Sequence, residues 1–345
     1  MPSLLKLLQF FLFLVLGVGI MYWVYIRQDA SYQAYCIQNS IPAEDCILSK
    51  KLWNDLVNVK PIFLVIILVA FLISNYFRSL RWRMILSSIG YNVKEVNSLG
   101  PILVGYFANL GLPRSGEFIR AALLTRYEKI PITVSVGTVV LDRLVDLVSM
   151  SIIITFTVLT QTDTFVRLYQ EHLSHIPIIQ QLIIPVSGIL FLVVTFLTRN
   201  IWKHWKFIQL LKSKITGFLS GLLAIRKIEN KLKFLFYTIM IWVWFFVMMY
   251  ASLKSFGPTS QLSISAALVI YVFGSLGMLV PTPGGMGSYH FLVILALYYF
   301  GIHEVEAFSF ANISFFSAQF ATNIILGISA LITLYIYNRK PKHLV

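Results

Sequence analysis

Three charged residues at helical spacing lie in the segment 111–120, Gly-Leu-Pro-Arg-Ser-Gly-Glu-Phe-Ile-Arg, between two short apolar runs. Arg114, Glu117 and Arg120 are three residues apart, so they fall roughly on one face of a helix that begins near Gly116. A helix N-terminus attracts anions, because its first amide groups are unpaired and its dipole end is positive. A guanidinium group binds phosphate through two parallel hydrogen bonds. We therefore expect Arg114 and Arg120 to contact an anionic group.

A second charged cluster, Leu-Asp-Arg-Leu-Val-Asp at 141–146, lies near the start of a long apolar segment. Asp142 and Asp146 share a helical face and repel each other unless a cation lies between them. Arg143 can pair with Asp146, and either of the two arginines described above can reach Asp142. Charged groups at membrane depth are usually paired and functional. The two aspartates and Glu117 therefore form either a buried salt-bridge lattice that fixes neighbouring helices or part of a substrate site.

A glycine-rich break, Pro-Thr-Pro-Gly-Gly-Met-Gly-Ser-Tyr-His at 281–290, interrupts another apolar run. Glycine lets a backbone approach a ligand closely and expose its N–H groups. Gly284, Gly285 and Gly287 are therefore candidate contacts for the same anion. The segment matches no nucleotide-binding pattern. His290, which directly follows it, is either a proton carrier or a helix-capping residue.

The composition is that of a membrane protein. The chain has 345 residues, of which 58% are hydrophobic and 12% are charged, whereas a soluble domain is about 25% charged. We predict an all-α polytopic membrane protein with one membrane domain over residues 1–345. The net charge of +14 does not indicate nucleic acid, because the basic residues mostly flank apolar segments. No nucleophile with a paired base and no metal-ligand spacing occurs, so we expect no enzyme activity, no metal and no cofactor.

Apolar segments of spanning length alternate with two interrupted ones. About six full spans are predicted, at 4–26, 61–77, 132–160, 179–198, 234–253 and 307–337. The segments 98–128 and 262–300 each contain two short apolar halves around a break, which is typical of a re-entrant hairpin. In this topology the two hairpins enter the membrane from opposite faces. That arrangement is typical of an inverted-repeat transporter, whose substrate site lies near the midplane where the breaks meet.

Basic residues mark the cytoplasmic side of this topology and place both termini there. Arg78, Arg81 and Arg83 mark one cytoplasmic end of a span. The segment 199–233 alternates basic with aromatic and aliphatic residues, which predicts an amphipathic helix on an anionic leaflet.

The segment 27–60 is predicted to be an extracytoplasmic loop. It contains Cys36 and Cys46, the two cysteines of the chain. In an oxidising compartment they can form a disulfide, but the sequence leaves open whether they do.

Four motifs in this order resemble the lysylphosphatidylglycerol synthase transmembrane-region family, the flippase-like membrane domain of multiple-peptide-resistance factors. They are Arg81-Trp-Arg83, Asn109-x-x-x-Pro113-x-x-x-Glu117-x-x-Arg120, Asp142-Arg-x-x-Asp146 and Pro283-Gly-Gly-x-Gly287. The resemblance covers about residues 60 to 337. It implies a membrane domain that binds or moves polar-headed lipids. The aminoacyl-transferase domain of bifunctional members is missing, so lysyl transfer is not implied, and His290 stands where the family often has glutamate.

The resemblance implies a non-enzymatic lipid translocator of the bacterial inner (plasma) membrane. Its expected partner is a phospholipid or polyprenyl lipid with an anionic or aminoacylated headgroup. The alternative is an accessory subunit of a lipid or cell-envelope pathway that transports nothing. A third option, an intramembrane glycosyltransferase, needs an acidic metal site, and Asp142 and Asp146 lie too near arginines to form one. A continuous polar cavity joining both hairpin breaks would favour the translocator. The sequence leaves a homo-oligomer open.

Overall fold

The computed structural model describes residues 46–111, 115–163, 165–166, 170, 223–280, 282 and 285–339, together with scattered residues between 15 and 44. Every regular element in this part of the chain is a helix, so the predicted all-α class is confirmed for it. The α-helices are α2 (Leu48–Val57), α3 (Pro61–Ser87), α4 (Glu95–Gly111), α5 (Gly116–Glu128), α6 (Ile132–Thr160), α11 (Lys231–Ser255), α12 (Ile264–Gly277), α13 (Ser288–Tyr298), α14 (Glu304–Ser314) and α15 (Thr322–Tyr337). The shorter elements are the 3₁₀ turns η1 (Leu223–Lys227) and η2 (Gly257–Thr259) and the π-helical turn η4 (Phe315–Ala321).

Three helical stretches among the described residues are long and apolar enough to cross a membrane. They are α3, α11 and the continuous run of α14, η4 and α15 from Glu304 to Tyr337. Each coincides with a predicted span, and α6 coincides with a fourth. The predicted span 179–198, most of the span 4–26 and most of the basic segment 199–233 lie outside the described residues.

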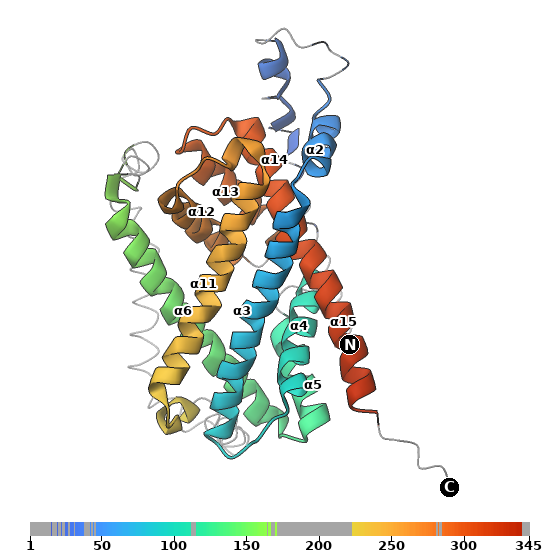
Figure 1. The fold of residues 1–345 in the computed structure, drawn as a ribbon, viewed down its shortest axis with the longest axis vertical. Coiled ribbons are helices and arrows are strands. Elements are labelled where there is room, and N and C mark those ends of the chain that lie inside the picture. The colour runs from blue at the N-terminus through green and yellow to red at the C-terminus, as the bar shows by residue number, and fades with distance from the viewer. Residues whose placement is uncertain are drawn as a thin grey trace, which may run out of the picture.

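Two long helices, α3 and α11, pack along each other in the middle of the molecule (Figure 1). Pro61 occupies the first turn of α3, where its missing N–H leaves no hydrogen bond unmade. Asn230 is the N-cap residue of α11, and its side chain accepts a hydrogen bond from the amide of Lys233 at 2.8 Å. Between the two helices, the hydroxyl of Ser74 donates to the carbonyl of Ile241 at 2.9 Å.

Each predicted hairpin is a pair of short helices, α4 with α5 and α12 with α13. The two pairs lie toward opposite ends of the molecule (Figure 1). In the first pair the backbones approach closely, since a Cβ added to Gly116 would lie 2.2 Å from the carbonyl oxygen of Gly105. The amide of Gly116 donates to the side chain of Asn109 at 2.8 Å, so this asparagine caps the N-terminus of α5.

The second pair turns at residues with left-handed backbone angles, Gly285 at φ +80° and Gly287 at φ +82°. A side chain at either position would be strained. A Cβ on Gly285 would also lie 2.3 Å from the sulfur of Met278. Gly285 and Gly287 are therefore required by the geometry of this break.

We expect Gly285→Ala to lower the free energy of unfolding by about 1–3 kcal/mol, because alanine is strained in this backbone region. Thermal unfolding of the purified protein, followed by tryptophan fluorescence, measures the change. Gly257→Ala is the matched control, since a Cβ there meets nothing within 4 Å. Equal melting temperatures for the two variants would contradict the prediction.

The predicted loop 27–60 contains a helix and a crosslink. Cys36 and Cys46 are joined in a disulfide. Both are buried in a small apolar cluster with Leu48 of α2 and with Val305 and Phe308 of α14. The cluster attaches this segment to α14.

Ion pairs strengthen the same attachment. Lys51 of α2 lies 2.9 Å from Asp55 and 3.2 Å from Glu306 of α14. Burial alone would lower the pKa of Lys51, but the two carboxylates outweigh it and raise the pKa above its ordinary value.

Candidate functional site

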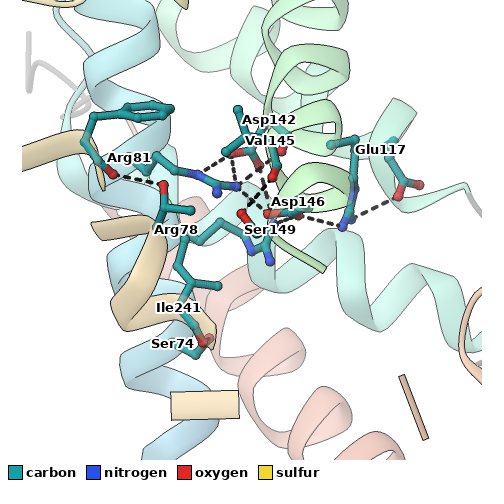
Figure 2. A network of polar contacts seen from close by, with 12 residues as sticks. Ser74, Arg78, Arg81, Glu117, Asp142, Val145, Asp146, Ser149 and Ile241 are labelled. Atoms are coloured by element: carbon teal, nitrogen blue, oxygen red, sulfur yellow. Dashed lines mark hydrogen bonds and ion pairs between the residues drawn. The ribbon is translucent and has the colours of Figure 1, made fainter. Parts of the chain in front are cut away.

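A buried charge lattice joins α3, α5 and α6. At its centre, Arg81 of α3 donates from Nε to Oδ1 of Asp142 at 2.9 Å and from Nη2 to the same oxygen at 2.5 Å. The same Nη2 reaches Oδ1 of Asp146 at 2.7 Å. The two aspartates of α6 thus share one arginine, and none of the three side chains is more than 10% exposed. Figure 2 shows Arg78 and Arg81 directed toward these two carboxylates.

Two further arginines complete the lattice. Arg78 of α3 binds Asp146 through a short hydrogen bond and lies 3.6 Å from Asp142. Arg120 of α5 donates from Nη1 to Asp142 at 2.8 Å. Its guanidinium carbon lies 3.8 Å from the ring centre of Trp82, which is a cation–π distance. The lattice therefore fixes the second helix of the first hairpin to both α3 and α6.

The pairs that the sequence predicted for Asp142 and Asp146 are present. Arg120 contacts the first aspartate, and Arg143 lies 3.5 Å from the second. The lattice also contains two arginines that the sequence analysis assigned to a cytoplasmic end. Arg78 and Arg81 are buried inside α3, which continues past the predicted end at residue 77. A buried arginine is tolerated because carboxylates from another helix compensate its charge.

The sequence signal for these two arginines was their spacing. Arg78 and Arg81 are three residues apart, so they share a face of α3, just as Asp142 and Asp146 share a face of α6. Matching periodicity on two apolar segments indicates a possible pairing, but it does not tell which segments lie side by side.

A further ion pair lies at the outer edge of the lattice. Nη2 of Arg143 lies 2.9 Å from Oε1 of Glu117, and Figure 2 shows Glu117 on the opposite side of the aspartates from Arg81. The side chain of Arg143 is 36% exposed and that of Glu117 is 29% exposed. Nε of Arg143 and Oε2 of Glu117 have no hydrogen-bond partner. Unpaired buried nitrogens also occur in the inner lattice, on Arg78, Arg81 and Arg120. The outer pair differs from the inner lattice in its exposure, since the side chains of Arg78, Arg81 and Arg120 are almost fully buried.

The charges of this cluster do not balance. Four arginines face three carboxylates among the described residues, namely Arg78, Arg81, Arg120 and Arg143 against Glu117, Asp142 and Asp146. Arginine stays protonated in proteins, so one positive charge is left over. An uncompensated charge in a region of low dielectric constant attracts an anion strongly.

The cluster forms one wall of a central cavity of about 620 Å³. This volume falls within the roughly 300–1,000 Å³ of typical ligand sites. Arg78, Glu117, Arg143 and Asp146 are its charged lining residues in the described part of the chain. The cavity also reaches both helix breaks, at Asn109 and Leu110 of the first pair and at Met278 to Val280, Thr282 and Gly285 of the second.

Much of the remaining lining of the cavity is apolar. It is formed mainly by aromatic and methionine side chains of α3, α6 and α11, namely Phe71, Met150, Trp242, Phe245, Met248 and Met249. The cavity is therefore amphipathic, whereas the feature that the sequence analysis named as favouring a translocator was a continuous polar cavity. The physical reason is that most of its lining comes from membrane-type helices, whose side chains are apolar.

The π-helical turn η4 and the first turn of α15 contribute further lining residues, of which Gln319 and Asn323 are polar. Ala318, Gln319 and, one turn later, Asn323 line the cavity. The sequence predicted an uninterrupted span over 307–337, and a buried asparagine within such a span is most often a helix-packing residue, as expected for Asn323. Its Oδ1 has no hydrogen-bond partner, although the side chain is buried. π-Helical turns occur frequently at functional sites.

Several predicted site residues do not line the cavity. Arg120, Asp142, Gly287 and His290 are buried behind its wall, so the anion contact expected for Arg120 does not fit its position. Its guanidinium is held by Asp142 and Trp82 instead. Gly285 does line the cavity. Its amide, however, donates to the carbonyl of Thr282 at 3.1 Å, so this N–H is unavailable to the expected phosphate. Arg114 and Gly284 lie outside the described residues.

His290 does not cap α13, contrary to one of its two expected roles. It is fully buried, and neither ring nitrogen has a hydrogen-bond partner. Its ring centre lies 4.8 Å from that of Phe315, the first residue of η4. The histidine therefore packs as an aromatic residue between the second hairpin and the π-helical turn.

Spanning helices with an internal charged cavity, in a described region that is entirely helical, define a class, that of polytopic membrane proteins with a cavity between their helices. More specifically, residues 47–327 match the model of the lysylphosphatidylglycerol synthase transmembrane region, and the chain belongs to that family.

The chain is also similar to a protein of an archaeon. It is 24% identical over 271 residues to the UPF0104 membrane protein MJ1595 of Methanocaldococcus jannaschii, an alignment that covers 73% of this chain and 79% of the relative. No solved structure matches the chain. Family membership fits a lipid-related role in a membrane.

Proposed function

We propose that this chain is a non-enzymatic lipid translocator, and the central cavity is the observation that supports this most. One amphipathic cavity reaches the breaks of both hairpins. A membrane lipid has the matching chemistry, with a charged headgroup at one end and apolar chains at the other. An accessory subunit has no need for a cavity that extends between the two breaks.

The charged wall is proposed to bind the phosphate of the lipid headgroup. Arg143 is the contact that we assign to it, because this side chain lines the cavity and is the most exposed of the four arginines in the cluster. The surplus positive charge of the cluster favours an anionic group. Arg81, Arg120 and Asp142 serve as a rigid scaffold behind Arg143. The methionine and aromatic wall would contact the acyl or polyprenyl chains.

The proposed translocator lies in the plasma membrane with α4–α5 and α12–α13 as re-entrant hairpins that enter from opposite faces. Their places toward opposite ends of the molecule support this (Figure 1). The end where α5 finishes and α11 begins carries Arg126, Lys129, Lys231 and Lys233. The positive-inside rule assigns that end to the cytoplasm. We refer to it below as the basic end.

The glycosyltransferase alternative would need Asp142 and Asp146 as metal ligands, and neither carboxylate is free. Both carboxylate oxygens of Asp142 and both of Asp146 are engaged by arginines. A divalent cation would have to displace guanidinium groups from a buried lattice.

A lipid-flipping assay in proteoliposomes tests the proposal. The full chain is reconstituted with a trace of fluorescent anionic phospholipid, and a membrane-impermeant reductant bleaches the label in the outer leaflet. We expect wild-type protein to expose the inner-leaflet label faster than protein-free vesicles do. Gln319→Trp should slow exposure several-fold, because the indole would project into the cavity.

Phe320→Trp is the matched control, since Phe320 is exposed on the outer surface and does not line the cavity. Equal slowing by both substitutions would count against transport through this cavity. If wild-type protein exposes the inner-leaflet label no faster than protein-free vesicles do, the result would favour the accessory-subunit alternative.

A further inference from the structure

A second pocket, which we call the interfacial pocket, lies at the basic end. It has a volume of about 380 Å³ and lies between the last turns of α3, the following loop and the first turns of α11. Arg83, Ser87, Tyr91, Asn92, Lys233 and Tyr237 contribute its polar groups. No described residue lines both this pocket and the central cavity. The two sites are therefore separate.

Two cations line the interfacial pocket. Nε of Arg83 donates to the carbonyl of Val93 at 3.1 Å, which orients the guanidinium. Its Nη1 is 3.7 Å from Glu95, a long and exposed pair that neutralises it weakly. The ammonium of Lys233 lies 5.8 Å from the ring centre of Tyr237, and no carboxylate among the described residues forms an ion pair with it. The pocket carries a positive charge that its own residues do not balance.

The backbone around the pocket adds to this charge. Asn230 is the N-cap residue of α11, so the positive end of the helix dipole lies beside Lys233. Hydroxyl and amide groups of the pocket can donate hydrogen bonds to an oxyanion. A phosphate group is the ligand chemistry that combines negative charge with several acceptor oxygens.

The surface next to the pocket is apolar. Leu232 is 81% exposed and Phe236 is 50% exposed on the first turns of α11. Tyr76 of α3 is also exposed. Apolar surface beside a basic pocket at the end of spanning helices is the environment of lipid headgroups. A ligand there would have its phosphate in the pocket and its chains along the helices.

We propose that the interfacial pocket binds the phosphodiester of an anionic phospholipid of the leaflet at the basic end, through Arg83 and Lys233. This site holds a lipid at the rim of the protein and does not depend on translocation through the central cavity.

A lipid titration tests this site. The full chain carrying Arg143→Gln, which weakens binding in the central cavity, is placed in nanodiscs of zwitterionic lipid. Short-chain phosphatidylglycerol is added, and the rise in melting temperature gives an apparent affinity. Adding Arg83→Gln and Lys233→Gln should lower that affinity about fivefold for each removed charge.

Lys227→Gln with Lys231→Gln is the matched control, because both lysines are at the same end but do not line the pocket. An equal loss of affinity in the control pair would overturn the proposal, since surface charge alone would then explain binding. Unchanged affinity in the pocket variant would overturn it as well. In a third measurement, inorganic phosphate replaces the lipid. If phosphate raises the melting temperature of the protein as much as the lipid does, the pocket binds a soluble anion and the proposal is wrong.

Discussion

Replacing Asp142 by asparagine is expected to lower the free energy of unfolding by about 3–5 kcal/mol, the loss found when one partner of a buried ion pair is removed. Asparagine keeps the shape of the side chain but leaves Arg81 and Arg120 without their shared carboxylate. Both guanidinium groups are buried, so water cannot compensate their charge. Thermal unfolding in detergent and the yield of folded protein from membranes measure the effect.

Asp163→Asn is the matched control, because Asp163 is exposed just beyond the end of α6. It should change stability by less than about 0.5 kcal/mol. Adding Arg120→Gln to Asp142→Asn removes one uncompensated charge, so the double variant should be more stable than Asp142→Asn alone. Additive losses in the double variant would show that the lattice does not act through charge balance.

Replacing Arg143 by glutamine is expected to slow translocation of an anionic lipid about ten- to a hundredfold while the protein stays folded. The expected factor corresponds to the loss of hydrogen bonds between a charged donor and a phosphate. The melting temperature should change little, because the ion pair between Arg143 and Glu117 is partly exposed and such pairs contribute about 1 kcal/mol or less. The proteoliposome assay measures the rates for anionic and zwitterionic lipids side by side.

Glu117→Gln is expected to act in the opposite direction. The carboxylate holds Arg143 at 2.9 Å, so its removal frees the guanidinium for the ligand and should raise the rate for an anionic lipid. Arg126→Gln is the matched control, because Arg126 is exposed in the last turn of α5 and does not line the cavity. If wild-type protein translocates anionic and zwitterionic lipids at equal rates, Arg143 does not select for anionic headgroups.

Sequence patterns predicted several local features of the described part of this chain. Long apolar runs predicted α3, α11 and the run from Glu304 to Tyr337, because a membrane-spanning helix needs about 20 apolar residues. Proline and glycine predicted the breaks near Gly116 and Gly285, where only a small residue fits the backbone. Charge spacing predicted that Asp142 and Asp146 need arginine partners. Each of these properties depends on residues close together in the chain.

The tertiary structure decided which of the charged residues line the cavity. In the sequence, Arg78 and Arg81 have the pattern of basic residues that flank a membrane span. Only the packing of α3 against α6 brings them into contact with the aspartates. Arg120 has the residue type and position of an anion contact, but Asp142 and Trp82 enclose it. Arg78 and the more exposed Arg143 line the cavity instead. Burial of a charge depends on its partners, and partners from distant helices are chosen by packing that no local pattern encodes.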